Sequence, residues 1–159
     1  MAADAWLLAR DYLSVAPQEL TVKYKGGRQW LGLRDLGREV KRRTRGWDSP
    51  KMLMWGWQSP LYIYADMDSV TRHMFADPLL KAYAAEGRHP LIVPRLARIV
   101  EDVKREQPKL VFCGDPPFPA LRDELERDYL PSQTAFRGPN GEGLWIAKAW
   151  RDRYDHPEP

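Results

Sequence analysis

Two polar turns that follow apolar runs carry the side chains best placed for binding chemistry. The first is Gly56-Trp57-Gln58-Ser59, after the apolar residues 51–55, and the second is Gly114-Asp115, after residues 109–113. Ligands of open α/β sheets bind outside the carboxyl ends of the strands, so both turns are expected to face one crevice. The ligand contacts predicted for this crevice are Trp57, Gln58, Ser59, Gly114 and Asp115.

Each group of the crevice suits a particular part of a ligand. Free amides at the start of a helix beyond Ser59 would favour an anion or a polar oxygen. Gly114 lets backbone approach closely, and Asp115 is able to accept hydrogen bonds from sugar hydroxyls. A tryptophan face beside a carboxylate suits a carbohydrate, which is apolar on one side and hydroxylated at its rim. The alternative is that Trp57 packs against Pro60 or Phe118 and closes the crevice, with Asp115 acting as a turn residue.

An acidic pair, Asp66 and Asp68, is the weak candidate for metal chemistry. Two hard oxygen ligands near one another could hold a divalent cation beside a diphosphate, as in nucleotide-sugar glycosyltransferases. The motif Asp66-Met67-Asp68 is only three residues long and follows a short predicted helix, where it is typical of a capping turn. We therefore expect no metal centre here.

The common cofactor motifs are missing from the sequence. A dinucleotide-binding turn needs Gly-x-Gly-x-x-Gly after the first strand, whereas here Gly56 is followed by Trp57. A Walker phosphate loop is also absent. The single cysteine, Cys113, excludes an internal disulfide, and no histidine lies close to it in sequence. We predict no cofactor and assign no catalytic residue.

Composition and charge indicate an ordinary globular protein. The 159 residues suit one domain, with 30% charged and 43% hydrophobic residues. The net charge of +3 is too small to imply a polyanion without a clustered patch, so no nucleic-acid partner is expected. The dense basic run 41–45 fits a solvated helix end, with phosphate or lipid-headgroup contact as the alternative. No stretch reaches the roughly 18 apolar residues of a membrane span, and the N-terminus does not look like a signal peptide, so we expect a soluble chain.

The spacing of apolar residues predicts an α/β fold. Helices are expected over 4–13, 17–24, 29–43, 60–65, 77–87, 91–106 and 119–129, and strands over 51–55, 70–75 and 109–113. Residues 133–137 and 143–150 should form a hairpin around Asn140-Gly141. The alternation predicts a three-layer, Rossmann-like open sheet, mainly parallel, with an antiparallel hairpin at one edge. Residues 1–28 are expected to be a helical lead-in or linker, 29–150 a single α/β domain, and 151–159 a flexible tail.

Several segments resemble the extramembrane C-terminal region of membrane-embedded glycosyltransferases that use polyprenyl-phosphate sugar donors, the protein O-mannosyltransferase and aminoarabinose transferase superfamily. The segments that carry this resemblance are 53–62, 69–75, 94–103, 108–111 and 118–121 with Tyr129. The resemblance covers roughly residues 29–150. The resemblance implies a small α/β domain at the extracytoplasmic face of the membrane.

The multi-span membrane region of that superfamily has no counterpart in this sequence. Its catalytic acid lies in a loop between the first membrane spans, and no residue here matches that loop, so no catalytic role is carried over. The resemblance implies a non-catalytic domain that assists access of an acceptor or lipid-linked donor, with the membrane-embedded catalytic region as its partner. Two alternatives stay open: a stand-alone α/β protein that binds a sugar or phosphate, and a metal-dependent nucleotide-sugar transferase using Asp66 and Asp68.

Overall fold

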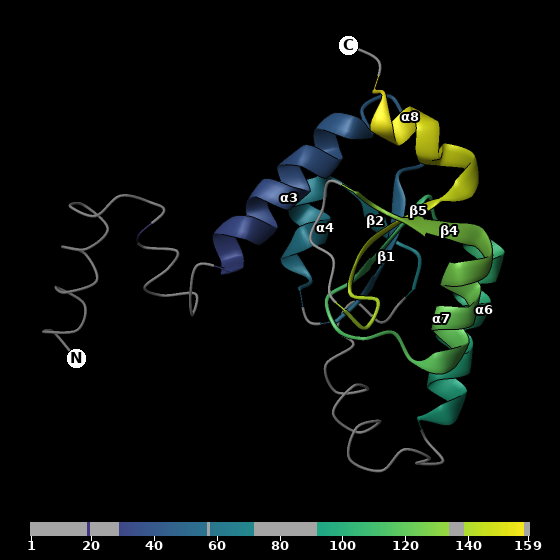
Figure 1. Ribbon diagram of the computed structural model, residues 1–159. Coiled ribbons are helices and arrows are strands. Elements are labelled where there is room, and N and C mark those ends of the chain that lie inside the picture. Colours follow the sequence, from purple (N-terminus) through teal and green to yellow (C-terminus); the bar gives the residue numbers. More distant parts are fainter. Residues whose placement is uncertain (1–18, 20–28, 57, 72–91, 134–138, 158–159) are drawn as a thin grey trace, which may run out of the picture.

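The protein is described by a computed structural model, which covers residue 19 and residues 29–56, 58–71, 92–133 and 139–157 (Figure 1). The helices of this part of the chain are α3 Gln29–Arg43, α4 Pro60–Ala65, α6 Val93–Glu106, α7 Pro119–Asp128 and α8 Arg151–Asp155, with a 3-10 turn, η1, at Lys148–Trp150. The strands are β1 Lys51–Trp55, β2 Asp68–Ser69, β3 Leu110–Cys113, β4 Tyr129–Pro131 and β5 Gly143–Ala147.

These strands form one five-stranded sheet in the order β2-β1-β3-β5-β4. The first three strands are parallel: Met52 of β1 is level with Ser69 of β2 and with Leu110 of β3. The antiparallel strand β5 follows, with Ile146 opposite Leu110, and β4 pairs with its outer edge. The described fold is therefore mixed α/β, with a parallel half and an antiparallel half.

Hydrophobic clusters cover both faces of the sheet. Side chains of a strand alternate between faces, and in β1 Met52 and Met54 join one cluster while Leu53 and Trp55 join the other. The first cluster takes residues from α3, α4 and α8, and the second from α6 and α7. In Figure 1 the sheet accordingly stands between α3 and α4 on the left and α6 and α7 on the right.

Gly37 lets α3 and α4 approach closely. A β-carbon at Gly37 would overlap the Tyr64 β-carbon and lie 3.0 Å from the carbonyl carbon of Tyr64 and 3.2 Å from the amide nitrogen of Ala65. The close neighbour of this glycine is therefore helix α4. Helical glycine disfavours the helix by about 1 kcal/mol relative to alanine, and the close crossing explains why it is present.

The second and fourth strands differ from the predictions. A strand was expected over 70–75 after a turn at 66–69, but β2 begins at Asp68, because Asp66 alone turns the chain with a φ of 57°. Residues 72–75 lie outside the described part. The expected hairpin arm 133–137 is also wrong in part: Gln133 is not in a strand, and β5 pairs with Tyr129–Pro131, where the helix prediction had run on to residue 129. Residues 134–137 are outside the described ranges.

The expected flexible tail, 151–159, begins with a helix that is part of the core. β5 ends at Ala147, and η1 and α8 follow it directly. Tyr154 in α8 is only 1% exposed. Arg43 Nη1 donates to the Tyr154 carbonyl at 3.0 Å, and Arg151 Nη1 donates to the Pro131 carbonyl of the edge strand β4 at 2.7 Å. One buried tyrosine and two arginine contacts therefore fix a segment that is otherwise polar.

Candidate functional site

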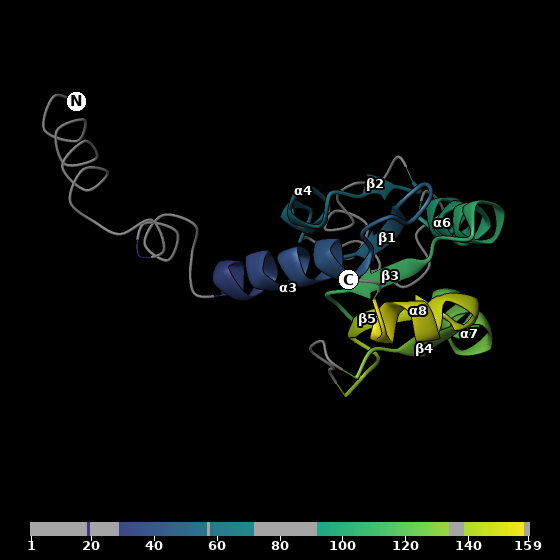
Figure 2. The ribbon, with the colours of Figure 1, turned by 90° about the horizontal axis from the view of Figure 1, so that it is seen from above.

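The candidate site lies where the chain leaves β1 and β3 in opposite directions. From β1 the chain passes through α4 to β2 at one edge, and from β3 it passes through α7 to β4 at the other edge. The two helices pack on opposite faces of the sheet (Figure 2). Such a reversal of strand order separates the two loops at the carboxyl ends, and in open α/β sheets ligands bind at that point.

Four of the residues around this point meet in space. A β-carbon at Gly114 would overlap the whole carboxamide of Gln58, and one at Gly56 would overlap its Oε1 atom. The Gly56 position would also lie 3.0 Å from Asp115 Oδ2 and 3.3 Å from the Cα of Gly114. The two glycines thus make room for the Gln58 side chain, which lies between the turns. The predicted residues Gln58, Gly114 and Asp115 do come together, and Gln58 fills the space between the glycines.

Two buried acceptor oxygens lie at this point, beside the Nε2 donor of Gln58. Gln58 Oε1 is buried and receives no hydrogen bond from any described residue. The Asp115 Oδ2 atom is buried beside the same glycine. A buried acceptor without a donor is disfavoured by roughly 1–3 kcal/mol, so each such group in a folded protein needs an explanation. A ligand that supplies hydrogen-bond donors would provide one.

Backbone and aromatic contacts hold the two turns in place. Gly114 N–H donates to the Trp55 carbonyl at 2.7 Å, and Trp55 Nε1 donates to the Pro116 carbonyl at 3.0 Å. The ring of Trp55 meets Phe118 edge-on, with centroids 4.9 Å apart. Gly56 has a φ of 136°, a conformation that side-chain-bearing residues rarely adopt. These contacts fix the positions of the polar groups before any ligand arrives.

The helix amides beyond Ser59 are not free, contrary to the prediction. Ser59 is the N-cap residue that precedes α4, but its hydroxyl makes no capping hydrogen bond. The Leu61 amide donates to the Gln58 carbonyl at 2.9 Å and the Tyr62 amide to the Ser59 carbonyl at 3.1 Å, while Pro60 has no amide hydrogen. The anion site expected from these amides is therefore wrong. Trp57, the fifth predicted contact, lies outside the described residues.

The aromatic and thiol groups near the site belong to the core. Tyr62 is 4% exposed, and its hydroxyl accepts a hydrogen bond from the Met54 amide at 2.9 Å. Cys113 is a free, buried cysteine, and burial raises the pKa of its thiol far above the usual range. A thiol in that state is not a nucleophile at neutral pH.

The acidic pair Asp66 and Asp68 is divided between two structural positions. Asp66 ends α4, and its carboxylate lies 2.9 Å from Lys41 Nζ of α3. Asp68 begins β2 opposite Lys51 of β1. Among the described residues, no three acidic, histidine or cysteine side chains gather where they could hold a metal ion.

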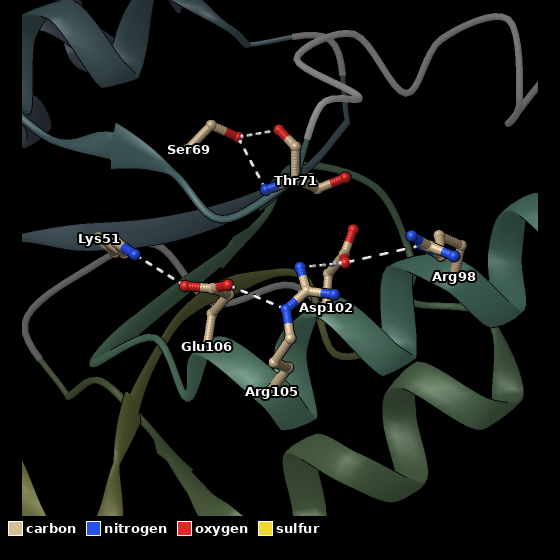
Figure 3. A network of polar contacts seen from close by, with 7 residues as sticks. All are labelled: Lys51, Ser69, Thr71, Arg98, Asp102, Arg105 and Glu106. Carbon is tan, nitrogen blue, oxygen red and sulfur yellow. Dashed lines mark hydrogen bonds and ion pairs between the residues drawn. The ribbon is translucent and has the colours of Figure 1, made fainter.

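A separate ion-pair network joins α6 to the start of β1 (Figure 3). Lys51 Nζ lies 2.7 Å from Glu106 Oε2, Arg105 lies 3.0 Å from the other Glu106 oxygen, and Arg105 also lies 2.7 Å from Asp102 Oδ1. Hydrogen bonds, first from Lys51 and then from Arg105, lower the pKa of Glu106. Each acid in the network has a cation beside it, so the arrangement anchors the helix.

The sequence did not predict a groove at the opposite end of the sheet. This groove has a volume of about 550 Å³. The last turns of α6 and α7 line it together with η1, and the lining residues include Lys104, Glu124 and Trp150. Glu124 is 5% exposed and is paired with Lys104 at 3.6 Å and with Arg127. No sequence motif marks this groove, because its residues come from three separate segments.

Comparison with protein-family models, with curated proteins and with solved structures finds no match for this chain. None of the described helices has the length and apolar character needed to cross a bilayer.

Proposed function

We propose that this chain is a non-catalytic binding domain that takes a hydroxyl-bearing ligand, a sugar, between the turns after β1 and β3. The observation that carries the proposal is the buried Oε1 atom of Gln58, which receives no hydrogen bond from a described residue at the point where the strand order reverses. Amide and carboxylate oxygens accept hydrogen bonds, and sugar hydroxyls donate them. A fully ionised phosphate offers no hydrogen-bond donor to the buried Gln58 oxygen, so a sugar is the better match for that atom.

The resemblance to membrane glycosyltransferases supplies the context of this proposal. In a three-layer, Rossmann-like domain at the extracytoplasmic surface, a sugar site of this kind would receive the glycan acceptor or the sugar of the lipid-linked donor. The chemistry itself would belong to a membrane-embedded catalytic region. The stand-alone sugar-binding protein uses the same site, whereas a nucleotide-sugar transferase gains no support, because Asp66 is engaged by Lys41.

Titration of the ¹⁵N-labelled protein by NMR tests this proposal. We expect neutral sugars to shift the amides of Gly56, Gln58, Ser59, Gly114, Asp115 and Phe118, and inorganic phosphate to leave them unchanged. Gln58→Met removes the acceptor at similar length and should abolish the shifts, while Gln133→Met, at an exposed glutamine, serves as the matched control. The absence of shifts at millimolar sugar would overturn the proposal, as would equal loss in both variants.

A further inference from the structure

Four cations form a line along α3 and the turn that follows it. Arg34, Arg38, Lys41 and Arg45 recur at i, i+4, i+7 and i+11. At 3.6 residues per turn this spacing keeps side chains within a narrow arc of the helix. The helical path continues past Arg43, because the Thr44 amide donates to the Val40 carbonyl at 2.9 Å. We call these four residues the cationic stripe.

The stripe runs beside α4. Gly37, between Arg34 and Lys41, contacts Tyr64, and Lys41 Nζ lies 2.9 Å from Asp66. One turn before Asp66, Ile63 is 80% exposed, which makes it the most exposed large hydrophobic side chain of the described residues. An aliphatic side chain thus projects from the same surface as the cations.

The stripe retains an excess of positive charge. Arg34 is paired with Asp35 at 3.2 Å and Lys41 with Asp66 at 2.9 Å, so two acids offset two of the four cations. Arg38 and Arg45 are exposed and form no ion pair within the described part of the chain. The surface therefore combines free positive charge with an exposed apolar side chain.

We propose that this α3–α4 surface docks on an anionic lipid bilayer. Basic side chains near such a surface are attracted to its headgroups, and an exposed aliphatic side chain inserts at the headgroup–acyl boundary. The chemistry of Ile63 favours lipid over nucleic acid, because strands without base pairing are bound by aromatic stacking in addition to cations. This surface is separate from the sugar site, so its role does not depend on the proposed function.

Vesicle co-sedimentation tests the charge part of the proposal. The protein should bind vesicles of phosphatidylcholine mixed with phosphatidylglycerol, and not vesicles of phosphatidylcholine alone. Arg34→Gln with Arg38→Gln should lower partitioning about thirtyfold, since each basic residue near an anionic surface contributes about fivefold. Arg95→Gln with Arg122→Gln removes the same charge from the exposed surfaces of α6 and α7 and should have little effect.

Variants of Ile63 test the apolar part of the proposal. They also distinguish binding to an anionic membrane from binding to a nucleic acid. Ile63→Ser, at unchanged charge, should lower partitioning roughly tenfold, and Ile63→Trp should raise it. Equal binding to neutral vesicles, or equal loss in both double variants, would overturn the proposal. So would a protein that binds short DNA but not vesicles, with Ile63→Trp having no effect, since the stripe would then be a nucleic-acid site.

Discussion

The two ends of the sheet differ in whether their polar side chains have hydrogen-bond partners. At the amino ends of β1 and β3, Lys109 Nζ donates to the Asp48 carbonyl and lies 3.8 Å from the centre of the Trp150 ring. Trp150 in turn packs on Trp47, with ring centroids 4.8 Å apart. At the carboxyl ends the side chain between the strands is Gln58, and its oxygen has no described donor. The polar group at the amino end therefore has its partners, whereas the acceptor oxygen at the carboxyl end has no described donor.

The polar groups at the amino end are already paired within the fold, whereas the Gln58 oxygen at the carboxyl end is available to a ligand. Paired charges and packed rings contribute to stability and offer little to a ligand. An unmet buried acceptor is unfavourable for folding, and proteins tend to retain such groups where function needs them. Substitutions at the two ends should therefore have opposite consequences for stability and binding.

The largest effect is expected from Trp47→Ala at the amino end. Trp47 is 6% exposed and contacts both Trp150 and Tyr154, so its removal leaves a large cavity. The free energy of unfolding should fall by about 3–5 kcal/mol in urea denaturation followed by circular dichroism. Trp150→Ala, at a partly exposed ring, should cost less, and an equal loss would contradict the assignment of Trp47 as the centre of this end.

At the carboxyl end, Gly56→Ala should be the most damaging single change. With a φ of 136° the backbone is unfavourable for alanine, and the new methyl group would also meet Gln58 and Asp115. We expect a loss of roughly 1–3 kcal/mol in the free energy of unfolding. Gly46→Ala is the control, because Gly46 has a φ of 77° with no atom near its β-carbon position. If Gly46→Ala lowered the free energy of unfolding as much as Gly56→Ala, backbone strain would explain the whole effect and contact with Gln58 and Asp115 would explain none of it.

A matched pair of methionine substitutions compares the two ends directly. Lys109→Met removes a charged hydrogen bond and a cation–π contact, and should lower the free energy of unfolding by about 1–2 kcal/mol. Gln58→Met removes an acceptor without a described donor, and should leave stability unchanged or raise it by up to about 1 kcal/mol. Sugar-induced NMR shifts should persist in the first variant and vanish in the second. Equal destabilisation by both would refute the contrast between the ends.

The smallest effect concerns Glu39, which joins the amino-end contacts through Arg43. Hydrogen bonds from Arg42 and Arg43 lower the pKa of Glu39 to about 2. Because the folded pKa is lowered, this stabilisation is present above the ordinary value and is lost as the pH falls from about 4.5 towards 2. The side chain is 39% exposed, so Glu39→Gln should cost less than about 1 kcal/mol at neutral pH. The difference in the free energy of unfolding between Glu39→Gln and wild type should disappear near pH 2. A difference that does not change with pH would show that it comes from packing and not from the charge of Glu39.

Apolar spacing was sufficient to predict the central strands β1 and β3 and the helices α3 and α4, whereas the parallel edge strand β2 was placed too late in the chain. The prediction gave the bounds that the structure has for helix 29–43, strand 51–55 and helix 60–65. Each of these segments has its own apolar periodicity and is flanked by glycine, proline or polar turn residues. The meeting of Gln58, Gly114 and Asp115 followed from the rule that ligand sites lie at the carboxyl ends of strands. These features depend on local sequence and on topology, and both can be read along the chain.

Features that depend on distant partners were not predictable in the same way. Tyr129 continues the i, i+4 spacing of Leu121 and Leu125, so sequence alone assigns it to a helix, whereas pairing with Ala147 places it in a strand. The occupation of the crevice by Gln58 depends on two glycines far apart in sequence. The net charge of +3 did not indicate the cationic stripe. A net charge is summed over the whole chain and does not report where the charged residues lie.

The burial of Tyr154 has a consequence for how the protein folds during synthesis. The cluster around α3 contains residues from Leu33 to Tyr154, and the bond from Arg43 to the Tyr154 carbonyl joins residues 111 positions apart. On the ribosome this face of the sheet cannot close until α8 has emerged, so Trp47 and its neighbours stay uncovered throughout most of translation. Contacts of such long sequence separation slow folding and prolong the exposure of apolar surface. Ribosome-bound chains that end before residue 151 should therefore be held by chaperones, and chains stalled in a C-terminal linker long enough to bring α8 out of the ribosome should be released.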